Sequence, residues 1–260
     1  MESGYHLSVC MLASGSKGNS IFISDGTTSI LVDAGLSGIE IERRLKSIGK
    51  SPGDLNAVLV SHEHDDHIRG VGILSRRFHL PVYISRKTEK SALSGLKKLY
   101  DIKYFECGSG FKIKTFNIHP FSIPHDAEDP AGFTISQNGT KIGVATDLGM
   151  ATSLVKEHLK GCSVLILEAN HDPEMLMTGP YPWHLKQRIR SRTGHLSNEA
   201  SGNLLLEVQH EHLSHVILAH LSETNNTPEK ALNAVKERIC HSHIRITVAA
   251  QNECSGLFYL

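Results

Sequence analysis

Short apolar runs separated by turn residues fill the first third of the chain. HLSVCML, SIFISDG and SILVDAG are rich in β-branched and aliphatic residues, and the segments between them, ASGSKGNS and DGTT, are typical of turns. Apolar positions then recur with helical spacing, as in Ile39, Leu45 and Ile48 among charged neighbours. The pattern predicts helices at about 37–48, 68–78 and 86–99, and further strands at AVLV (57–60) and PVYIS.

The same order, strands first and then alternating strands and helices, returns after Cys107. FKIKTFNIHPFSIPH and GFTISQNGTKIGVATD predict strands, and NGT predicts a hairpin turn. Helices at about 151–159, 197–209 and 228–239 are expected to alternate with the strands SVLILEA, HVILAH and IRITVA. Two such halves predict an α/β (α+β) fold with two mixed sheets and outer helices, a four-layer αββα sandwich. No linker divides the chain, so we expect one domain over residues 1–260.

Composition and charge narrow the class of protein. The 260 residues are 40% hydrophobic and 21% charged, and the net charge is zero, so any basic surface must be local. Five scattered cysteines without a C-x-x-C pair favour free thiols in a reducing compartment. We find no signal-peptide pattern and no run of 18 apolar residues, and we therefore expect a cytoplasmic protein without a membrane partner.

Histidine is the unusual component, with 17 residues, and it is concentrated in VLVSHEHDDHIRG at residues 58–70. His62 and His64 are two residues apart, so on an extended loop both imidazoles can face one point. Asp66 and His67 follow at the first turn of the next predicted helix and can face a neighbouring point. Imidazoles and carboxylates in this arrangement indicate two adjacent metal pockets, whereas a single zinc ion would need only three of these groups.

Three later strands each end in a residue that can bind a metal: FSIPH, KIGVATD and HVILAH. A bridging hydroxide would complete both shells of a two-metal site and could act as the nucleophile on a phosphoryl or acyl group. The ligand types suit Zn²⁺, Mn²⁺ or Fe without choosing between them. The seven predicted ligands are His62, His64 and His125 on one metal, Asp66, His67 and His220 on the other, and Asp147 between them.

ILVDAG, SHEHDDH, IPH, ATD and LAH, in this order, resemble the metallo-β-lactamase fold superfamily. The resemblance implies that Asp33, in the DAG element, orients the histidine loop, and it counts Asp66 among the catalytic residues as well as the ligands. The superfamily includes thioesterases, lactonases, β-lactamases, tRNA 3′-processing nucleases and DNA exonucleases. The antibiotic hydrolases lack the Asp-His end of the motif, so the chain departs from them.

The segment RSRTGHLSNEA bears on the substrate. His195 resembles the histidine of the His-Ser-Thr element in tRNA 3′-processing phosphodiesterases, which implies that it protonates the departing oxygen and that Glu168, in LILEAN, orients it. An alkoxide leaving group gains roughly 10²–10⁴-fold from such an acid. ASGSKGNS, SHEHDDH, LEANHD and GHLSN together resemble the YycJ/WalJ group of bacterial proteins. That resemblance implies a metal-dependent 5′-to-3′ exonuclease acting on DNA.

Two segments are candidates for substrate binding, each with a simpler alternative. PYPWHLKQRIRSR carries Lys186 and three arginines after Tyr181 and Trp183, and it favours either nucleic-acid binding or a solvated amphipathic helix with a buried Trp. ASGSKGNS could cradle a phosphate or form a plain turn. His171 could support the acid pair or simply neighbour a helix cap. The predicted substrate contacts are Lys17, Asn19, Arg188 and Arg192.

The residues predict a dinuclear metal-dependent phosphodiesterase, and the resemblance to the YycJ/WalJ group favours a 5′-to-3′ DNA exonuclease. The alternatives are an RNA-processing nuclease, a small ester or thioester hydrolase of the same fold, and a regulatory protein whose site is a relic. The intact set of seven ligands argues against the relic, because loss of the chemistry would remove the need for the ligands. The sequence predicts no oligomeric state.

Overall fold

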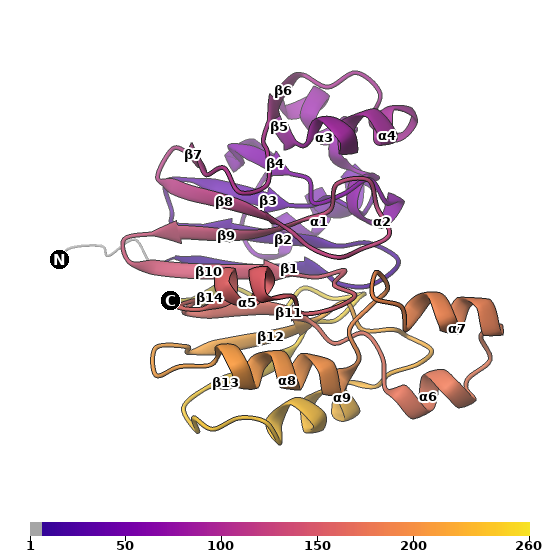
Figure 1. The fold of residues 1–260 in the computed structure, drawn as a ribbon. Helices are drawn as coiled ribbons and strands as arrows, with labels where there is room; N and C mark the ends of the chain where they lie inside the picture. Colours follow the sequence, from indigo (N-terminus) through magenta and orange to yellow (C-terminus); the bar gives the residue numbers. More distant parts are fainter. Residues whose placement is uncertain (1–6) are drawn as a thin grey trace. The chain divides into compact units, whose positions relative to one another are not determined.

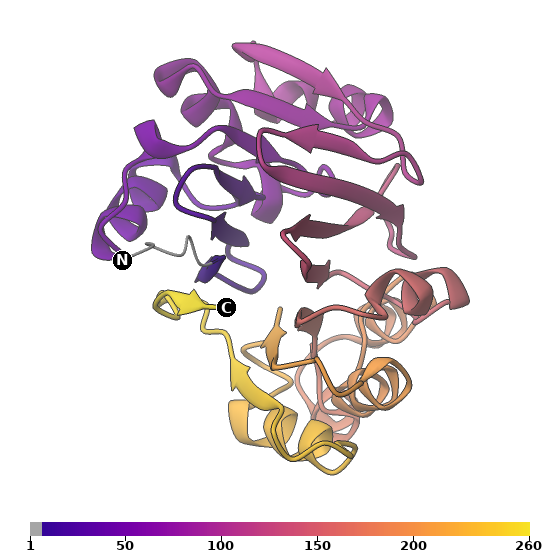
Figure 2. The same ribbon diagram turned by 90° about the vertical axis from the view of Figure 1, so that its left-hand side faces the viewer.

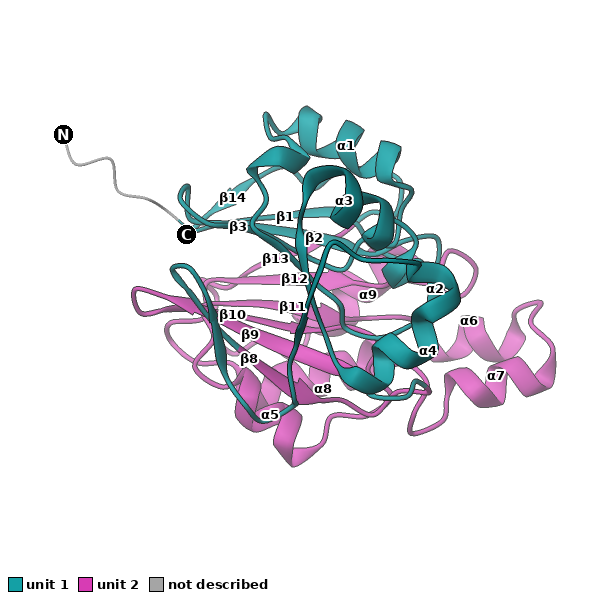
Figure 3. Ribbon diagram, turned by 90° about the horizontal axis from the view of Figure 1, so that it is seen from above, with its two compact units in different colours: residues 1–118, 127–129, 250–260 teal, residues 119–126, 130–249 magenta. Residues whose placement is uncertain are grey.

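The computed structural model describes residues 7–260, and this part of the chain forms two compact units (Figure 3). The first unit contains the residues up to 118 together with 127–129 and 250–260. The second contains 119–126 and 130–249. Each unit has its own buried apolar cluster. The assignment of a single domain to residues 1–260 stays a prediction.

The sheet of the first unit has seven strands in the order β14-β1-β2-β3-β4-β5-β6. Neighbours from β14 to β3 are antiparallel and those from β3 to β6 are parallel, so the sheet is mixed, as expected. The central strands β1 to β4 are buried throughout. The bounds are β1 Ser8–Ala13, β2 Ser20–Ser24, β3 Ser29–Val32, β4 Ala57–Leu59, β5 Pro81–Ile84, β6 Asp101–Tyr104 and β14 Phe258–Tyr259.

Side-chain caps start the helices of the first unit. The hydroxyls of Ser37 and Ser85 accept hydrogen bonds from backbone N–H groups in the first turns of α1 and α4. The helix expected at 68–78 begins at Val71, and a separate short helix ends at Ile68. Between them Gly70 donates its N–H to Ala34 O and not to a carbonyl of the preceding turn. The bounds are α1 Gly38–Ser47, η1 Pro52–Asp54, α2 Asp65–Ile68, α3 Val71–Phe78 and α4 Arg86–Leu96.

The second sheet also has seven strands, in the order β13-β12-β11-β10-β9-β8-β7, and the boundary between the units falls inside β8. The NGT hairpin is confirmed, since Asn138 and Gly139 have positive φ between the antiparallel β9 and β10. From β10 to β13 the strands are parallel. The bounds are β7 Phe111–Ile113, β8 Phe116–Ser122, β9 Ala131–Gln137, β10 Thr140–Ala145, β11 Val164–Glu168, β12 His215–Ala219 and β13 Arg245–Val248.

Helices α5, α8 and α9 lie on one side of the β10–β13 part of this sheet (Figure 2). Two short helices that the sequence pattern did not clearly define, α6 and α7, lie together at one end of the second unit (Figure 1). Two mixed sheets flanked by helices confirm the predicted α/β class. In residues 7–260 no helix has the length and apolar character to cross a bilayer. The bounds are α5 Ser153–Leu159, α6 Pro173–Thr178, α7 Trp183–Ile189, α8 Asn198–Val208 and α9 Pro228–Lys236.

Candidate metal centre

Asp33, directly after β3, holds the start of the histidine loop. Its Oδ1 accepts from Ser61 N at 2.8 Å, and its Oδ2 accepts from Ser61 Oγ and from His67 Nδ1, both at 2.8 Å. The carboxylate is almost completely buried, so all these bonds form away from water. Asp33 therefore orients His67 and leaves the Nε2 of that ring as the atom that can bind a metal.

The two residues after Asp33 pack against the backbone of the histidine loop and of the turn before β2. Ala34 N donates to His67 O at 2.9 Å, and Gly35 N donates to Asn19 O at 2.9 Å. A Cβ on Gly35 would come within 1.6 Å of Asp66 O, so only glycine allows this approach. The DAG element therefore places the backbone of α2, and with it Asp66 and His67.

The histidines of the loop converge within the first unit. His62 and His67 have no exposed surface, and their ring centroids are 4.1 Å apart. The Nε2 of His62 lies 3.0 Å from the Nδ1 of His64. Asn19 Nδ2 lies 3.0 Å from both Asp66 Oδ2 and His67 Nε2. The first unit thus gathers three imidazoles and a carboxylate at one point.

In the second unit, the chemistry-bearing residues follow the ends of adjacent strands. Asp147 comes after β10, Glu168 ends β11, and His220 comes after β12. Ligand atoms of these three residues and of His195 all lie within 4.8 Å of one another. Because β10, β11 and β12 are parallel, their carboxyl ends meet at one edge of the sheet, where ligands of open α/β sheets bind.

Three of the predicted site residues have a left-handed backbone. The φ values are 60° at Asp33, 55° at Asp147 and 56° at His220. Such values are uncommon for residues other than glycine and are enriched at functional sites, where the surrounding packing maintains them. In each case the left-handed residue lies within two residues of the end of a strand.

Hydrogen bonds fix which ring nitrogen of His220 and of His125 faces Asp147. His220 Nδ1 lies 2.8 Å from Glu168 Oε1, and His125 Nδ1 lies 3.3 Å from Gly194 O. The Nε2 atoms of these rings lie 3.4 Å and 3.8 Å from Asp147 Oδ1. Acceptors on Nδ1 with Nε2 facing a carboxylate are typical of histidines that bind a metal.

The donor set fits divalent metal ions. Neutral imidazoles held by outer hydrogen bonds, together with carboxylates, are ligands that zinc, manganese and iron share. Burial lowers the pKa of His125 and so favours the neutral ring that a metal requires. The seven residues would supply this ligation, and their assignment to individual ions stays a prediction.

His195 and Glu168 form the ion pair that the sequence suggested. Their Nδ1 and Oε1 atoms are 2.7 Å apart, while Glu168 Oε2 accepts from the backbone N–H groups of Leu148 and Leu196. Burial favours the neutral forms, but the attraction between the two groups outweighs it. The pKa of Glu168 is therefore held well below its usual range, and the pKa of His195 is raised.

Gly194 positions His195 on its loop. His195 N donates to Ile189 O at 2.8 Å, and a Cβ on Gly194 would lie 2.2 Å from that same oxygen. The close packing of this turn against the end of α7 therefore requires glycine, and it directs the imidazole towards Glu168.

The predicted substrate contacts have different surroundings. Lys17 is exposed on the turn between β1 and β2, whereas Asn19 contacts the histidine loop. Arg188 pairs with Asp126 at 2.5 Å, and Arg192 Nε lies 3.3 Å from Met150 Sδ. Their roles in substrate binding stay predictions.

Two details of these segments correct the sequence-based interpretation. Backbone N–H groups of the ASGSKGNS turn already bind within the first unit, since those of Gly15, Lys17 and Gly18 donate to protein oxygens. In the basic segment, Trp183 is 57% exposed, so the alternative with a buried Trp is wrong. Lys186 is buried instead, and its ammonium donates to Met177 O and Gly179 O, which occupies it away from any phosphate.

Sequence reasoning missed two supporting residues. Ser61 joins Asp33 to the loop, and its Oγ lies 3.0 Å from His62 Nδ1. Asn170 Nδ2 donates to His220 O at 2.9 Å and so supports the left-handed turn there. Ser61 directly precedes the histidine cluster in the sequence, which was the available signal. Asn170 and His220 are distant in sequence and carried none.

Known proteins of similar sequence and fold are metal-dependent hydrolases or share their fold, in agreement with the metal centre described above. Residues 28–221 match the β-lactamase superfamily domain model. Exodeoxyribonuclease YycJ of Bacillus anthracis is 38% identical over 90% of this chain and 89% of its own. Exodeoxyribonuclease WalJ of Streptococcus pneumoniae is 36% identical over 95% of this chain and 93% of its own. The crystal structure of the metallo-β-lactamase fold protein YhfI from Bacillus subtilis shares the fold, with a TM-score of 0.75, 17% identity, and coverage of 98% of this chain and 99% of its own. The chain therefore belongs to the β-lactamase superfamily of metal-dependent hydrolases and, within it, to the group that contains the YycJ and WalJ proteins.

Proposed function

We propose that this protein is a metal-dependent nuclease that degrades DNA from the 5′ end. The observation that carries the proposal is the His195–Glu168 pair beside Asp147 and His220 in the second unit. A proton donor at this place serves a reaction with a poor leaving group, such as the alkoxide of a phosphodiester. The names of the two relatives, both exodeoxyribonucleases, support the same substrate.

Superfamily membership implies divalent metal ions, and we propose two of them, zinc, manganese or iron. When bound, they would supply an activated water as nucleophile and neutralise charge on the phosphoryl group. In the first unit, Asp33 and Ser61 hold the histidine loop in position for ligation. The proposed ligands are His62, His64, Asp66, His67, His125, Asp147 and His220.

His195 acts on the leaving oxygen. Its Nδ1 is held by Glu168, so Nε2 carries the transferable proton of the charged ring. Glu168 is fully buried and accepts four hydrogen bonds, two from imidazoles and two from backbone N–H groups. This carboxylate orients the ring of His195, and its negative charge favours the protonated form of that ring. As the P–O bond breaks, the proton passes from Nε2 to the departing O3′, and the neutral ring is later reprotonated from solvent.

We also propose a cytoplasmic location. The five cysteines are all free, and Cys10 and Cys162 are buried thiols whose pKa burial raises to about 11. Such thiols are packing groups without a disulfide partner, as in proteins of a reducing compartment.

A gel assay with purified protein and Mn²⁺ tests the proposed activity. Duplex DNA and duplex RNA would each be labelled separately at the 5′ and 3′ ends. We expect mononucleotides from the 5′ end of DNA, and no product with the His195→Ala or Asp147→Ala variants. His212→Ala is a matched control, because this histidine lies on the surface and its side chain is 81% exposed.

Two other outcomes would contradict the proposal. Cleavage of RNA in preference to DNA would identify an RNA-processing nuclease. Inactivity on both nucleic acids, with turnover of a thioester, would leave a hydrolase that does not act on phosphodiesters.

A further inference from the structure

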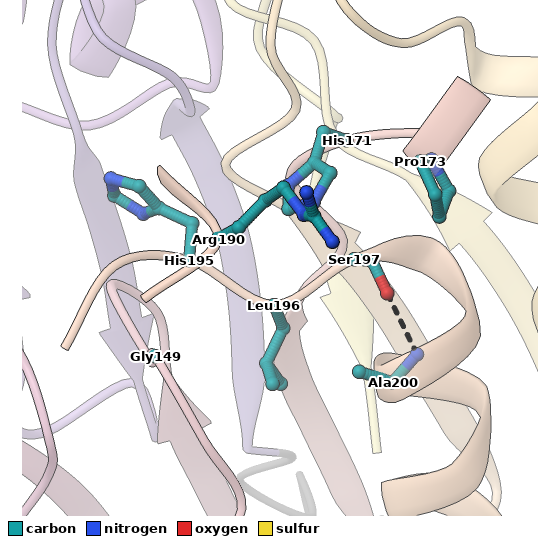
Figure 4. Close-up of a pocket in the computed structure, with 8 residues that line it drawn as sticks. All are labelled: Gly149, His171, Pro173, Arg190, His195, Leu196, Ser197 and Ala200. Carbon is teal, nitrogen blue, oxygen red and sulfur yellow. Dashed lines mark hydrogen bonds between the residues drawn. The ribbon is translucent and has the colours of Figure 1, made fainter. Parts of the chain in front are cut away.

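A pocket of about 260 Å³ opens in the second unit beside His195, and the proposed proton transfer uses none of its other lining residues. Three polar side chains, those of His171, Arg190 and Ser197, line it together with His195 (Figure 4). The volume is several times the roughly 30 Å³ that one water molecule occupies in the liquid. The pocket can therefore hold a polar group that belongs to a larger ligand.

His171 is the most informative of these residues. Its side chain is buried, with 3% exposure, and within residues 7–260 its Nδ1 has no hydrogen-bond partner. A buried polar atom without a partner costs free energy unless a ligand or water satisfies it. The backbone of the same residue is fixed, since His171 O accepts from Asn198 N at 2.9 Å. The backbone at His171 is thus fixed, and one polar atom of the buried ring is unused.

Arg190 supplies positive charge to the same pocket. It is exposed, and in the part of the chain that the structure describes its guanidinium has no carboxylate partner, only a contact to Met177 Sδ at 3.2 Å. Burial is the main reason that the pKa of His171 falls to about 4; the charge of Glu168 opposes this change, and those of His195 and Arg190 add to it. The neighbouring carboxylate Asp172 is already engaged, because it caps α6 and pairs with Lys230.

The third contribution comes from helix α8, which has 11 residues and starts at the pocket. Ser197 is its N-cap and accepts from Ala200 N, and both residues line the cavity, while Asn198 N donates to His171 O. These N–H groups already have partners, so the helix contributes its dipole and not free donors. The N-terminus of a helix carries partial positive charge and attracts anions. A guanidinium, an unused imidazole nitrogen and a helix N-terminus at one place match the chemistry of a phosphate group.

We propose that this pocket binds the 5′-terminal phosphate of the strand being degraded. The inference rests on the proposed function and extends it to the choice of strand end. His195 lines the pocket and also donates the proton to the leaving O3′. The leaving group of 5′-end cleavage is the terminal nucleotide, so its own 5′-phosphate lies on the side of His195 where the pocket is.

Each round of the reaction then produces the 5′-phosphate that the next round needs. Water adds to the second phosphorus, the bond from that phosphorus to O3′ breaks, and O3′ takes the proton of His195. The released nucleotide keeps its 5′-phosphate, and the shortened strand has a new 5′-phosphate. Each product strand thus carries the group that the pocket binds in the next round.

Inorganic phosphate provides a test that does not depend on nuclease activity. Zinc-loaded protein with ¹⁵N-labelled histidine would be titrated with phosphate, and the His171 signals would be assigned from a His171→Gln variant. We expect phosphate to shift the Nδ1 signal of His171, and Arg190→Gln to weaken the apparent affinity about tenfold, as loss of a charge-assisted bond does. Arg238→Gln removes the same charge outside the pocket and is expected to bind phosphate like the wild type.

A phosphate titration that leaves the His171 signals unmoved would overturn the pocket assignment, whether or not the protein cleaves DNA. A shift that Arg190→Gln does not weaken would equally overturn it, because binding would then occur at the metal centre alone. These results are separate from failure of the proposed function, which the end-labelled DNA assay reports.

Kinetics with DNA test the choice of strand end. Oligonucleotides of one sequence with a 5′-phosphate or a 5′-hydroxyl would be compared. We expect Arg190→Gln to raise the KM for the phosphorylated strand about tenfold and to leave that for the hydroxyl strand unchanged. Arg190→Lys is expected to recover part of the difference. Equal effects on both strands would overturn the terminal-phosphate proposal.

Discussion

The Nδ1 atom of His195 lies 2.7 Å from Oε1 of Glu168, and the same oxygen lies 2.8 Å from Nδ1 of His220. One buried carboxylate therefore orients both the proposed proton donor and a proposed metal ligand. Glu168 has no exposed surface, and these two rings and the backbone N–H groups of Leu148 and Leu196 stabilise its charge. Its removal would therefore affect both proton transfer and the geometry of the proposed ligand His220.

Replacing His195 with alanine is expected to lower kcat about 10²–10⁴-fold on DNA, because the departing alkoxide then lacks its proton donor. The loss should be much smaller on a phosphodiester with a nitrophenolate leaving group, which departs without protonation. Comparison of the two kcat ratios measures the role of the residue. Equal losses on both substrates would show that His195 positions the substrate and does not donate a proton.

The Asp33→Asn variant is expected to bind zinc about 10–100-fold more weakly, because the amide cannot accept the hydrogen bonds from both Ser61 and His67 in the same way. Titration calorimetry with zinc measures this change. Asp25→Asn is the matched control, since Asp25 is equally buried in the first unit but binds the turn at Thr27 and Thr28. Equal zinc affinity in both variants would contradict the role of Asp33.

A methyl group on Gly35 is expected to displace the histidine loop. Its Cβ would lie 1.6 Å from Asp66 O and 2.7 Å from Asn19 N, and both are backbone atoms that cannot move alone. We expect Gly35→Ala to lower the free energy of unfolding by at least about 2 kcal/mol and to weaken zinc binding. In Gly53→Ala the nearest atom is 3.6 Å away, so this variant should be close to wild type in denaturant titrations. Unchanged zinc affinity in Gly35→Ala would show that the loop adapts.

Glu40 makes the stability of the first unit depend on pH. Hydrogen bonds from Arg43 and Arg44 lower the pKa of Glu40 from 4.5 to about 2. Partial burial of the carboxyl opposes this shift but does not cancel it. Because the pKa of Glu40 is lower in the folded than in the unfolded state, its charge stabilises the fold at pH values above about 4.5. This contribution disappears as the pH falls from about 4.5 towards about 2.

We therefore expect Glu40→Gln to cost about 0.5–1 kcal/mol of unfolding free energy near neutral pH, because the partly exposed pair is screened by solvent. The difference from wild type should shrink in denaturant titrations at lower pH. A difference that stays constant down to about pH 3 would exclude this ion pair as its origin.

Local patterns in the sequence determined much of the architecture. Alternation and turn residues located most strands, and capping residues such as Ser37 and Ser197 stand where helices α1 and α8 begin. The motifs around His62 and His220 predicted metal-binding side chains just after the ends of strands, and in the structure these residues follow β4 and β12. These signals are local, because turn chemistry, capping and periodicity act over a few residues.

Other features were decided only by the tertiary structure. The break at Gly70 depends on a hydrogen bond to Ala34, and the supporting role of Asn170 depends on the fold bringing it to His220. Among the cations of the basic segment, Lys186 binds carbonyls at the end of α6 and Arg188 pairs with the distant Asp126, whereas Arg190 lines the pocket. No periodicity distinguishes these residues, because which charges remain available depends on the carbonyls and carboxylates that folding brings beside them.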